Sequence, residues 1–542
     1  MTLKVIAVLV LLALLAVPVL RWAFWPRRSL PGHRVRYQRL RLHLRLHPGH
    51  GHATAYELWR HWGRFAAARK AKYARPSMTR WERFTQPGEH SVTLGRAHYG
   101  HALRLPVEEH AVILSPPRQG KTGLLSSIIL RYPGPVLSTT TRADVYRDTV
   151  RVRDRLGLVD VFNPQNIGRV PSTMTWDPIP GCLDVATAIR RADAFALAVA
   201  SQGVEDGAFW AAKTSDYLRA FFFAAAFART KGVAYGMATT ARWALGGASQ
   251  EAEDILEDAG AHDWSAQVQE LRGEAQKTAQ TIRMYMTRAL GFLFDPSLAR
   301  SVSPRDDGSE LNLESFVRQP NTLYLIASGQ GEQSPLAPLF AALTNEIHYT
   351  AGLAGSFSPG GRLTRPLLFG LDEVTQICPV ALPEWLADSG GKGIQIIAVA
   401  HGVAQLRKRW GANGARVIQD CAGTEIVLPG LKDPDTLQAI STACGTVSMA
   451  ERGSENRSQH PVMTPAMIRA LPDKRALIVR TNRAPVICRI RQVWSDPLYK
   501  KARKEPLPVA DMLASAPVIP ITDAPVLPPA DPDGSAGLSG AA

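Results

Sequence analysis

The sequence has few cysteines, and their placement excludes two common kinds of site. The 542-residue chain has five, scattered and without a Cys-x-x-Cys pair: Cys182, Cys378, Cys421, Cys444 and Cys488. A disulfide framework needs an even set at regular spacing, and a structural zinc site needs clustered ligands, so neither is indicated. Buried thiols in a reducing compartment are the simplest interpretation.

Acidic residues are scarce near the N-terminus. Residues 21–83 contain sixteen Lys or Arg but only two acidic residues, Glu57 and Glu82, and the whole chain has a formal net charge of +16. Such an excess favours an acidic partner. For the basic juxtamembrane neck, defined as residues 26–91, two interpretations stay open: contact with anionic membrane lipid and direct contact with DNA.

Charged residues are absent from residues 5–20, which form an uninterrupted apolar run. With the aromatic residues that follow Arg21, the run approaches the roughly 20 residues that cross a bilayer. We predict a transmembrane anchor over residues 1–25; a cleaved signal peptide is the alternative, but no small-x-small cleavage site is evident. Lys4 stands alone before the run and several arginines follow it, so we expect a single-pass cell-membrane protein with a cytoplasmic body.

Residues 111–125 have the strand, loop and helix order that a phosphate-binding loop requires. The predicted nucleotide-binding residues are Ser115, Pro116, Pro117, Arg118, Gln119, Gly120, Lys121, Thr122 and Gly123. Backbone N–H groups of such a loop cradle phosphates, Lys121 would reach the β- and γ-phosphates, and the Thr122 hydroxyl would bind Mg²⁺. Ser115 stands where the motif has its first glycine, and the two prolines are expected to stiffen the loop instead.

A second set of polar residues completes the predicted site. Asp372 and Glu373 follow the apolar residues 367–371. Asp372 would hold Mg²⁺ together with Thr122, and Glu373 would polarise the attacking water. His401 and Gln405 follow the next expected strand and are candidates for sensing the γ-phosphate. The alternative for Gln405 is an ordinary exposed helix residue.

Alternating strands and helices predict an α/β fold with a mostly parallel sheet. The expected strands are 111–114, 135–138, 158–162, 322–327, 367–371, 395–399, 425–428, 476–479 and 486–490. The intervening region lacks strand-like segments and predicts helices at 185–201, 208–229, 250–258 and 264–293. The predicted organisation is anchor 1–25, neck 26–91, nucleotide-binding domain 92–183 and 318–495, all-α insertion 184–317, and disordered Pro/Ala-rich tail 496–542.

Together these residues resemble the TraG/TraD family of type IV secretion (conjugative) coupling proteins. The matching features, in order, are Leu-Gly-Arg at 94–96, His110, the phosphate loop, Val-Phe-Asn-Pro at 161–164, Trp-Asp-Pro at 176–178, Phe-Trp at 209–210, residues 369–373, residues 389–394, Gln-Leu at 405–406 and Trp-Gly at 410–411. The resemblance implies a RecA-like P-loop NTPase core with an all-α insertion domain and an N-terminal transmembrane helix. It also implies a homohexamer with ATP bound between subunits.

The chain departs from the family pattern at several positions. Besides Ser115, residues 138–144 lack the family's Asp-Pro-Lys-Gly, and His401 stands where glutamine is usual. The family's Gly-Arg-Gly, which supplies an arginine thought to act in trans, reads Gly-Gly-Lys-Gly around Lys392. Lys392 is therefore the candidate substitute, although lysine lacks the bidentate geometry of arginine.

The resemblance implies a DNA-stimulated ATPase of conjugative transfer that uses ATP and Mg²⁺. Its partners would be relaxase-bound DNA and type IV secretion channel proteins, with anionic lipid at the neck. Two alternatives remain open: a duplex DNA translocase of the segregation type, and a nucleotide-binding docking receptor with little turnover.

Overall fold

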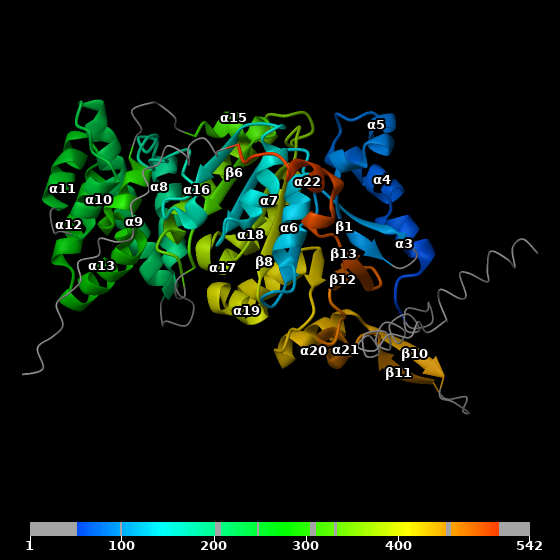
Figure 1. Cartoon of the computed structure of the whole chain (residues 1–542). Helices are drawn as coiled ribbons and strands as arrows, with labels where there is room; N and C mark the ends of the chain where they lie inside the picture. The colour runs from blue at the N-terminus through cyan, green and yellow to red at the C-terminus, as the bar shows by residue number, and fades with distance from the viewer. Residues whose placement is uncertain are drawn as a thin grey trace, which may run out of the picture.

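An eleven-stranded mixed sheet forms the centre of the chain in the computed structural model (Figure 1). The structure describes residues 51–97, 100–200, 207–245, 249–303, 311–329, 333–450 and 457–508. The strand order is β2-β1-β13-β12-β9-β3-β8-β7-β4-β6-β5. Their bounds are β1 Ser91–Ala97, β2 Ala102–Pro106, β3 Ala111–Leu114, β4 Val136–Thr140, β5 Val159–Phe162, β6 Thr322–Ile326, β7 Leu367–Leu371, β8 Ile394–Ala400, β9 Thr424–Val427, β12 Arg475–Arg480 and β13 Val486–Ile490.

The seven strands from β9 to β5 are all parallel, and β12, β13, β1 and β2 extend the sheet with antiparallel pairs. This confirms the predicted α/β fold with a mostly parallel sheet. The parallel strands read as continuous apolar runs because helices cover both of their faces.

The alternation of side chains along β3 shows the two faces. Val112 and Leu114 belong to a buried cluster with residues of helices 185–199, 337–356 and 403–421, whereas Ala111 and Ile113 belong to another with residues of helices 121–130 and 144–153. The helices associated with the sheet are α6 Lys121–Leu130, α7 Asp144–Arg153, α15 Leu313–Arg318, α16 Ala337–Ser356, α17 Val374–Ile377, α18 Leu382–Asp388, α19 Val403–Cys421, α20 Pro434–Ala443 and α21 Pro465–Arg469. A two-stranded ribbon, β10 Thr446–Ala450 and β11 Arg457–Pro461, was not predicted.

A region without strands separates β5 from β6 among the described residues, as the sequence predicted. Figure 1 shows its helices gathered at one end of the molecule, away from β1. The bounds are α8 Val185–Val199, α9 Gly207–Thr230, α10 Met237–Leu245, α11 Ser249–Asp258, α12 His262–Gly273, α13 Gln276–Leu290 and α14 Pro296–Ala299. The single helix expected over 264–293 is wrong: the chain turns extended at Glu274 and Ala275, and α12 and α13 pack separately against α9.

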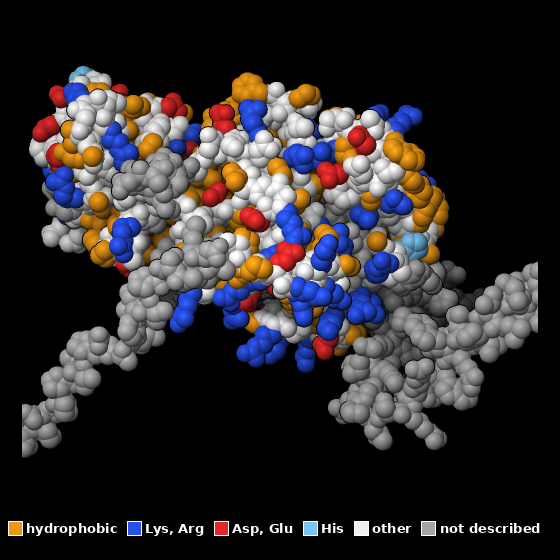
Figure 2. All heavy atoms as spheres, turned by 45° about the horizontal axis from the view of Figure 1, so that its top comes forward, with side chains coloured by type: hydrophobic (Ala, Val, Ile, Leu, Met, Phe, Trp, Pro, Cys, Tyr) orange, Lys and Arg blue, Asp and Glu red, His pale blue; other side chains and the backbone are white. Residues whose placement is uncertain are grey.

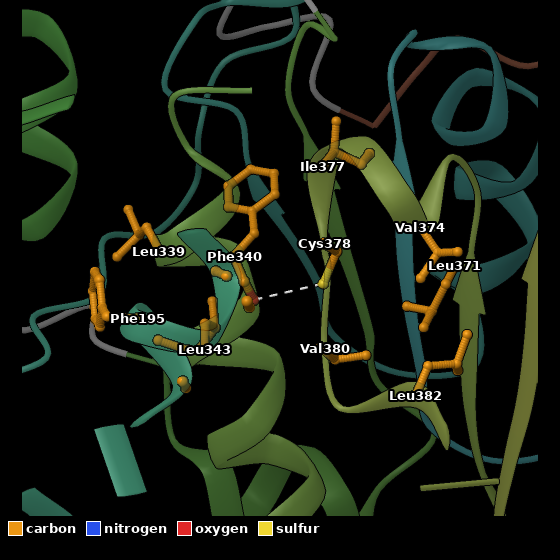
Figure 3. Close-up of a cluster of buried hydrophobic side chains, with 14 of the residues drawn as sticks. Phe195, Leu339, Phe340, Leu343, Leu371, Val374, Ile377, Cys378, Val380 and Leu382 are labelled. Atoms are coloured by element: carbon orange, nitrogen blue, oxygen red, sulfur yellow. Dashed lines mark hydrogen bonds between the residues drawn. The ribbon is translucent and has the colours of Figure 1, made fainter. Parts of the chain in front are cut away.

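The helical region joins the core through an apolar cluster. Figure 3 shows Phe195 of α8 and Phe340 of α16 on one side and Cys378 and Val380 on the other, and all four are buried. The Cys378 thiol lies 3.7 Å from the Phe340 carbonyl oxygen, and burial raises the pKa of this thiol to about 12. Cys378 is thus a protonated packing residue at physiological pH, in agreement with the interpretation of the cysteines as buried thiols.

A polar contact reinforces this junction. Arg409 of α19 donates to the carbonyl oxygens of Leu197 and Ala200, at the C-terminal end of α8, with 2.8 Å to the latter. The last carbonyls of a helix have no partner within the helix, and a cation there also complements the helix dipole. Arg409 therefore ties the helical region to the helix that starts beside His401.

The described part of the neck packs against the sheet edge. Its helices are α3 Ala55–Trp62, α4 Arg64–Ala74 and α5 Arg80–Thr85, and α3 and α4 contact β2. The Arg480 guanidinium lies 4.7 Å from the Trp62 ring centre and pairs with Glu109. Residues 1–25, the predicted membrane anchor, lie outside the described residues; within the described ranges no helix is long and apolar enough to cross a membrane.

The prediction that the chain is disordered from residue 496 is wrong for its first part. Residues 497–502 form α22 Pro497–Ala502, which contacts α7. Asp496 caps this helix through the Leu498 N–H and also pairs with Arg131 and Arg491. The Pro/Ala-rich composition of this region gave no indication of these contacts, since Arg131 and α7 are more than 300 residues away in the sequence.

Arg153 is a buried arginine that organises the sheet's β4 and β6 ends. It donates to Thr322 Oγ1 at 2.8 Å and to the carbonyl oxygens of Tyr132, Gly134 and Pro320 at 2.6, 2.8 and 3.0 Å. Burial lowers its pKa to about 10, which still leaves it charged at neutral pH.

We expect Arg153→Met to lower the free energy of unfolding by about 3 kcal/mol, because it leaves several buried carbonyl acceptors unpaired. The measurement is urea unfolding of the full chain in detergent. The matched control is Arg155→Ala, which removes a half-exposed ion pair with Glu505 and should change stability by less than about 0.5 kcal/mol. Equal effects of the two substitutions would contradict the prediction.

Candidate nucleotide site

The loop after β3 takes the form expected of a phosphate-binding loop. Gly120, with φ 88°, caps α6, and Arg118 also has a positive φ of 65°. The first N–H groups of α6 have no partner within the helix and are available to an anion. Lys121 begins the helix, and its buried residues Leu124, Leu125, Ile128 and Ile129 belong to the same apolar cluster as residues of the sheet.

The serine at position 115, where the motif has its first glycine, has a structural explanation. Its N–H donates to the Ala400 carbonyl oxygen at 3.0 Å, so Ser115 continues the pairing of β3 with β8. Its hydroxyl donates to the Pro116 carbonyl oxygen at 2.9 Å. Within this loop, positive φ values occur at Arg118 and Gly120, so the conformation that favours glycine is not needed at position 115.

Asp372 and Glu373 follow β7 and lie at the tip of Lys121. The Lys121 ammonium forms an ion pair with Glu373 and lies 3.5 Å from Asp372 Oδ1. Glu373 has the left-handed angles φ 51° and ψ 44°, an uncommon conformation for a residue other than glycine. The Thr139 hydroxyl donates to the Asp372 carbonyl oxygen at 2.9 Å, so β4 helps to fix this turn.

His401 and Gln405 follow β8, which lies between β3 and β7. His401 Nε2 is 3.1 Å from Glu373 Oε1, and its Nδ1 is 3.1 Å from the Ser115 carbonyl oxygen. Gln405 Oε1 accepts from the His401 N–H at 3.0 Å. The imidazole therefore bridges the phosphate loop and the carboxylate pair, while Gln405 holds the backbone that carries it.

The charges of this cluster shift the pKa of its members in different directions. Burial raises the pKa of Asp372, and Lys121 opposes the shift. Burial would also raise the pKa of Glu373, but the hydrogen bond from His401 and the charge of Lys121 lower it overall. The contact with Glu373 raises the pKa of His401 above its ordinary value of 6.5.

Two carboxylate oxygens of the pair are left without hydrogen-bond donors. Asp372 Oδ1 and Glu373 Oε2 are buried and accept no hydrogen bond. Orphaned buried acceptors of this kind fit a hydrated cation or a water molecule. Within the described ranges no group of three or more His, Cys, Asp or Glu could hold a metal unaided. Such a donor set suits Mg²⁺, which is commonly held by one or two carboxylates together with nucleotide phosphates.

Lys392 is not brought to this cluster. It lies in a short 3₁₀ turn before β8 and pairs with Asp388. His401 lies beyond the other end of the same seven-residue strand, which by itself spans roughly 20 Å at the usual rise per residue. The structure thus assembles Lys121, Asp372, Glu373, His401 and Gln405 within one chain and leaves Lys392 apart from them.

Two residues at the loop were missed by sequence reasoning. The Gln492 side-chain amide donates to the Gly120 carbonyl oxygen at 3.2 Å, and Trp494 lies against Gly123. Both belong to a segment about 370 residues beyond the loop. No spacing or motif in the sequence links the phosphate loop to this segment. They lie together because β13 pairs with β1 and β12 in the sheet.

A phosphate-binding loop on a parallel sheet, with an acidic pair at the end of a nearby strand, defines a P-loop NTPase fold. Residues 366–473 match the family model described as the TraM recognition site of TraD and TraG, which confirms the resemblance to the TraG/TraD family. This segment contains the acidic pair and His401. Comparison of the sequence with curated proteins gives no significant match.

Solved structures show the same fold. The plasmid coupling protein TrwB in complex with the GTP analogue GDPNP matches with a TM-score of 0.55 and 19% identity, covering 72% of this chain and 87% of that chain. TrwB with ADP and Mg²⁺ matches with a TM-score of 0.54 and 17% identity, over 72% and 87%. TrwB with the ATP analogue ADPNP matches with a TM-score of 0.52 and 17% identity, over 71% and 86%.

The raised pKa of His401 is testable directly. Its contact with Glu373 favours the imidazolium, so the stabilisation from this contact is complete below about pH 6.5 and is lost as the pH rises through the raised folded value. In nuclear magnetic resonance titrations of histidine-labelled full chain, the His401 signal, assigned by its loss in His401→Gln, should titrate above 6.5. In Glu373→Gln the midpoint should fall; an unchanged midpoint would show that the two side chains are not in contact.

Proposed function

We propose that this chain is a membrane-anchored ATPase of conjugative DNA transfer, which couples a relaxase-bound DNA substrate to a type IV secretion channel. The observation that carries the proposal is the convergence of Lys121, Asp372 and Glu373 at the carboxyl ends of the parallel strands. The family match over residues 366–473 and the shared fold with TrwB support the conjugative role.

The loop residues 115–123 would hold the phosphates of ATP, with the N–H groups of α6 directed at them. Thr122 and Asp372 would hold Mg²⁺, which when bound neutralises charge that develops on the phosphates. Lys121, which pairs with the carboxylates in this structure, would turn its ammonium to the phosphate oxygens. Glu373, kept ionised by its lowered pKa, would then accept a proton from the attacking water.

His401 would connect nucleotide state to the rest of the molecule. It touches Glu373 and Ser115 at once, so loss of the terminal phosphate would change the surroundings of its imidazole. Its backbone is held by Gln405 on α19, and Arg409 on the same helix holds the end of α8. This chain of contacts is the route by which we expect hydrolysis to move the helical region.

The assembly that we infer is a homohexamer, as the resemblance to the TraG/TraD family implies. Lys392 lies too far from its own site to act there. A lysine before β8 could instead reach the site of a neighbouring copy. For the region that matches the TraM recognition site, we infer a TraM-like protein partner beside the DNA and channel proteins.

The neck carries a surface suited to anionic membrane lipid. Tyr56, Trp59, Phe65 and Phe84 form a continuous chain of ring contacts with centres 5.2–6.1 Å apart, and Trp81 is 73% exposed. Figure 2 shows exposed hydrophobic side chains and nearby Lys and Arg on the part of the surface formed by α3–α5. Interfacial aromatic residues beside basic ones match the headgroup region of a bilayer.

We expect Lys121→Ala to weaken ATP binding and Glu373→Gln to preserve binding but lower hydrolysis at least about 100-fold, since general base catalysis contributes that much. The measurement is phosphate release by the detergent-purified full chain, with and without DNA. DNA should stimulate the parent protein, and Arg155→Ala should behave like it. Activity unchanged by both substitutions would reject the site, whereas a parent that binds ATP without turnover would support the docking receptor.

For the lipid surface, p-benzoylphenylalanine placed at position 81 of the full chain should form ultraviolet-induced adducts with phospholipid in native membranes, because Trp81 would lie at headgroup level. The same label in place of Phe357, which is 80% exposed on α16's C-terminal side, should not. Adducts of position 81 with DNA or protein, and none with lipid, would discard the lipid interpretation.

A further inference from the structure

The segment after β13 lies along helix α6 and is fixed at both ends. At one end Gln492 donates to the Gly120 carbonyl oxygen at 3.2 Å. At the other end Asp496 forms a bidentate pair with Arg131, at 2.6 and 2.7 Å, beyond the last turn of α6. Between them is a 3₁₀ turn, η8 Val493–Ser495, whose buried Val493 packs against Leu130.

This fixed backbone presents Trp494 beside the phosphate loop. A Cβ atom built on Gly123 would lie 2.6 Å from the tip of the Trp494 ring, so the indole contacts the first turn of α6. The same Cβ would collide with Gln492 Oε1, which explains the glycine that follows Thr122. Trp494 is nevertheless 49% exposed as a residue, so it has surface free to contact another planar group.

Gln492 provides an independent sign of a ligand. The side chain is 6% exposed, and its Oε1 atom accepts no hydrogen bond. A buried amide oxygen without a donor is costly unless a ligand or water supplies one. This oxygen points at Gly123, on the turn whose N–H groups would hold the phosphates.

The direction in which a nucleotide would lie along the loop decides which of its parts would reach Gln492 and Trp494. Lys121 and the carboxylate pair mark the terminal phosphate, because the motif's lysine reaches the β- and γ-phosphates. The α-phosphate of a bound nucleotide would then lie along the loop and the first turn of the helix, toward Gly123. Sugar and base follow the α-phosphate, so they would leave the loop near Gln492 and Trp494, which lie against Gly120 and Gly123.

We propose that Gln492 and Trp494 form the sugar and base subsite of the nucleotide site. Gln492 Oε1 accepts a hydrogen bond from a ribose hydroxyl, and the indole of Trp494 stacks on a purine base. An aromatic ring held by a rigid backbone loses little freedom on binding, so the stacking is favourable. This inference rests on the proposed function, since it takes the phosphates to lie in the loop.

The test compares a nucleotide with its phosphates alone. Calorimetric titration of the detergent-purified full chain with ATP and with inorganic tripolyphosphate, both with Mg²⁺, gives the two affinities. Trp494→Ala should raise the Kd for ATP about ten-fold, the scale of one base stacked on an aromatic ring, and change the Kd for tripolyphosphate less than about two-fold. Trp494→Phe, which keeps a ring, should recover most of the affinity for ATP.

Two controls separate the possible failures. Phe357→Ala, an exposed aromatic far from the loop in sequence, should leave both affinities unchanged. Lys121→Ala should weaken both ligands; if it weakens neither, the proposed function fails. If Trp494→Ala weakens both ligands equally, or leaves ATP binding unchanged while Lys121→Ala acts as expected, the base subsite is wrong although the phosphate site stands.

Discussion

The parallel adjacency of β3, β8 and β7 is the constraint on which the site depends. Their carboxyl ends lie side by side, and each supplies one component: the loop with Lys121, the imidazole of His401, and the acidic pair of Asp372 and Glu373. Neighbouring strands are about 4.8 Å apart, so Lys121 spans two strand positions with its extended side chain to reach Glu373. A strand order that moved β7 farther from β3 would separate the loop from its carboxylates.

Burial of these charges is unfavourable unless the side chains adopt the one geometry in which they pair. Taking an ammonium and two carboxylates out of water costs several kcal/mol per ion, which mutual attraction offsets only when the geometry is good. Lys121, Glu373 and His401 satisfy one another, but Asp372 Oδ1 and Glu373 Oε2 accept no hydrogen bond. The cluster is thus held in place while retaining capacity for further donors or a cation.

The antiparallel extension of the sheet gives the fold a second function beyond covering the edge. It returns the chain from β12 through β13 to the helix that begins at the phosphate loop, which places Gln492 against Gly120 and Asp496 against Arg131. On the opposite side, Arg409 ties α19 to the end of α8. Both the chain's C-terminal part and its helical region therefore contact elements that start at the site.

The sequence by itself determined the parallel α/β core, the helical region within it, and the residues Lys121, Asp372 and Glu373, because apolar periodicity and short motifs are local signals. Tertiary structure alone decided that Ser115 continues the pairing of β3 with β8. It also decided the placement of Trp494 and the order of α22. These features depend on contacts between segments hundreds of residues apart. Such contacts produce no periodic pattern or motif in the sequence.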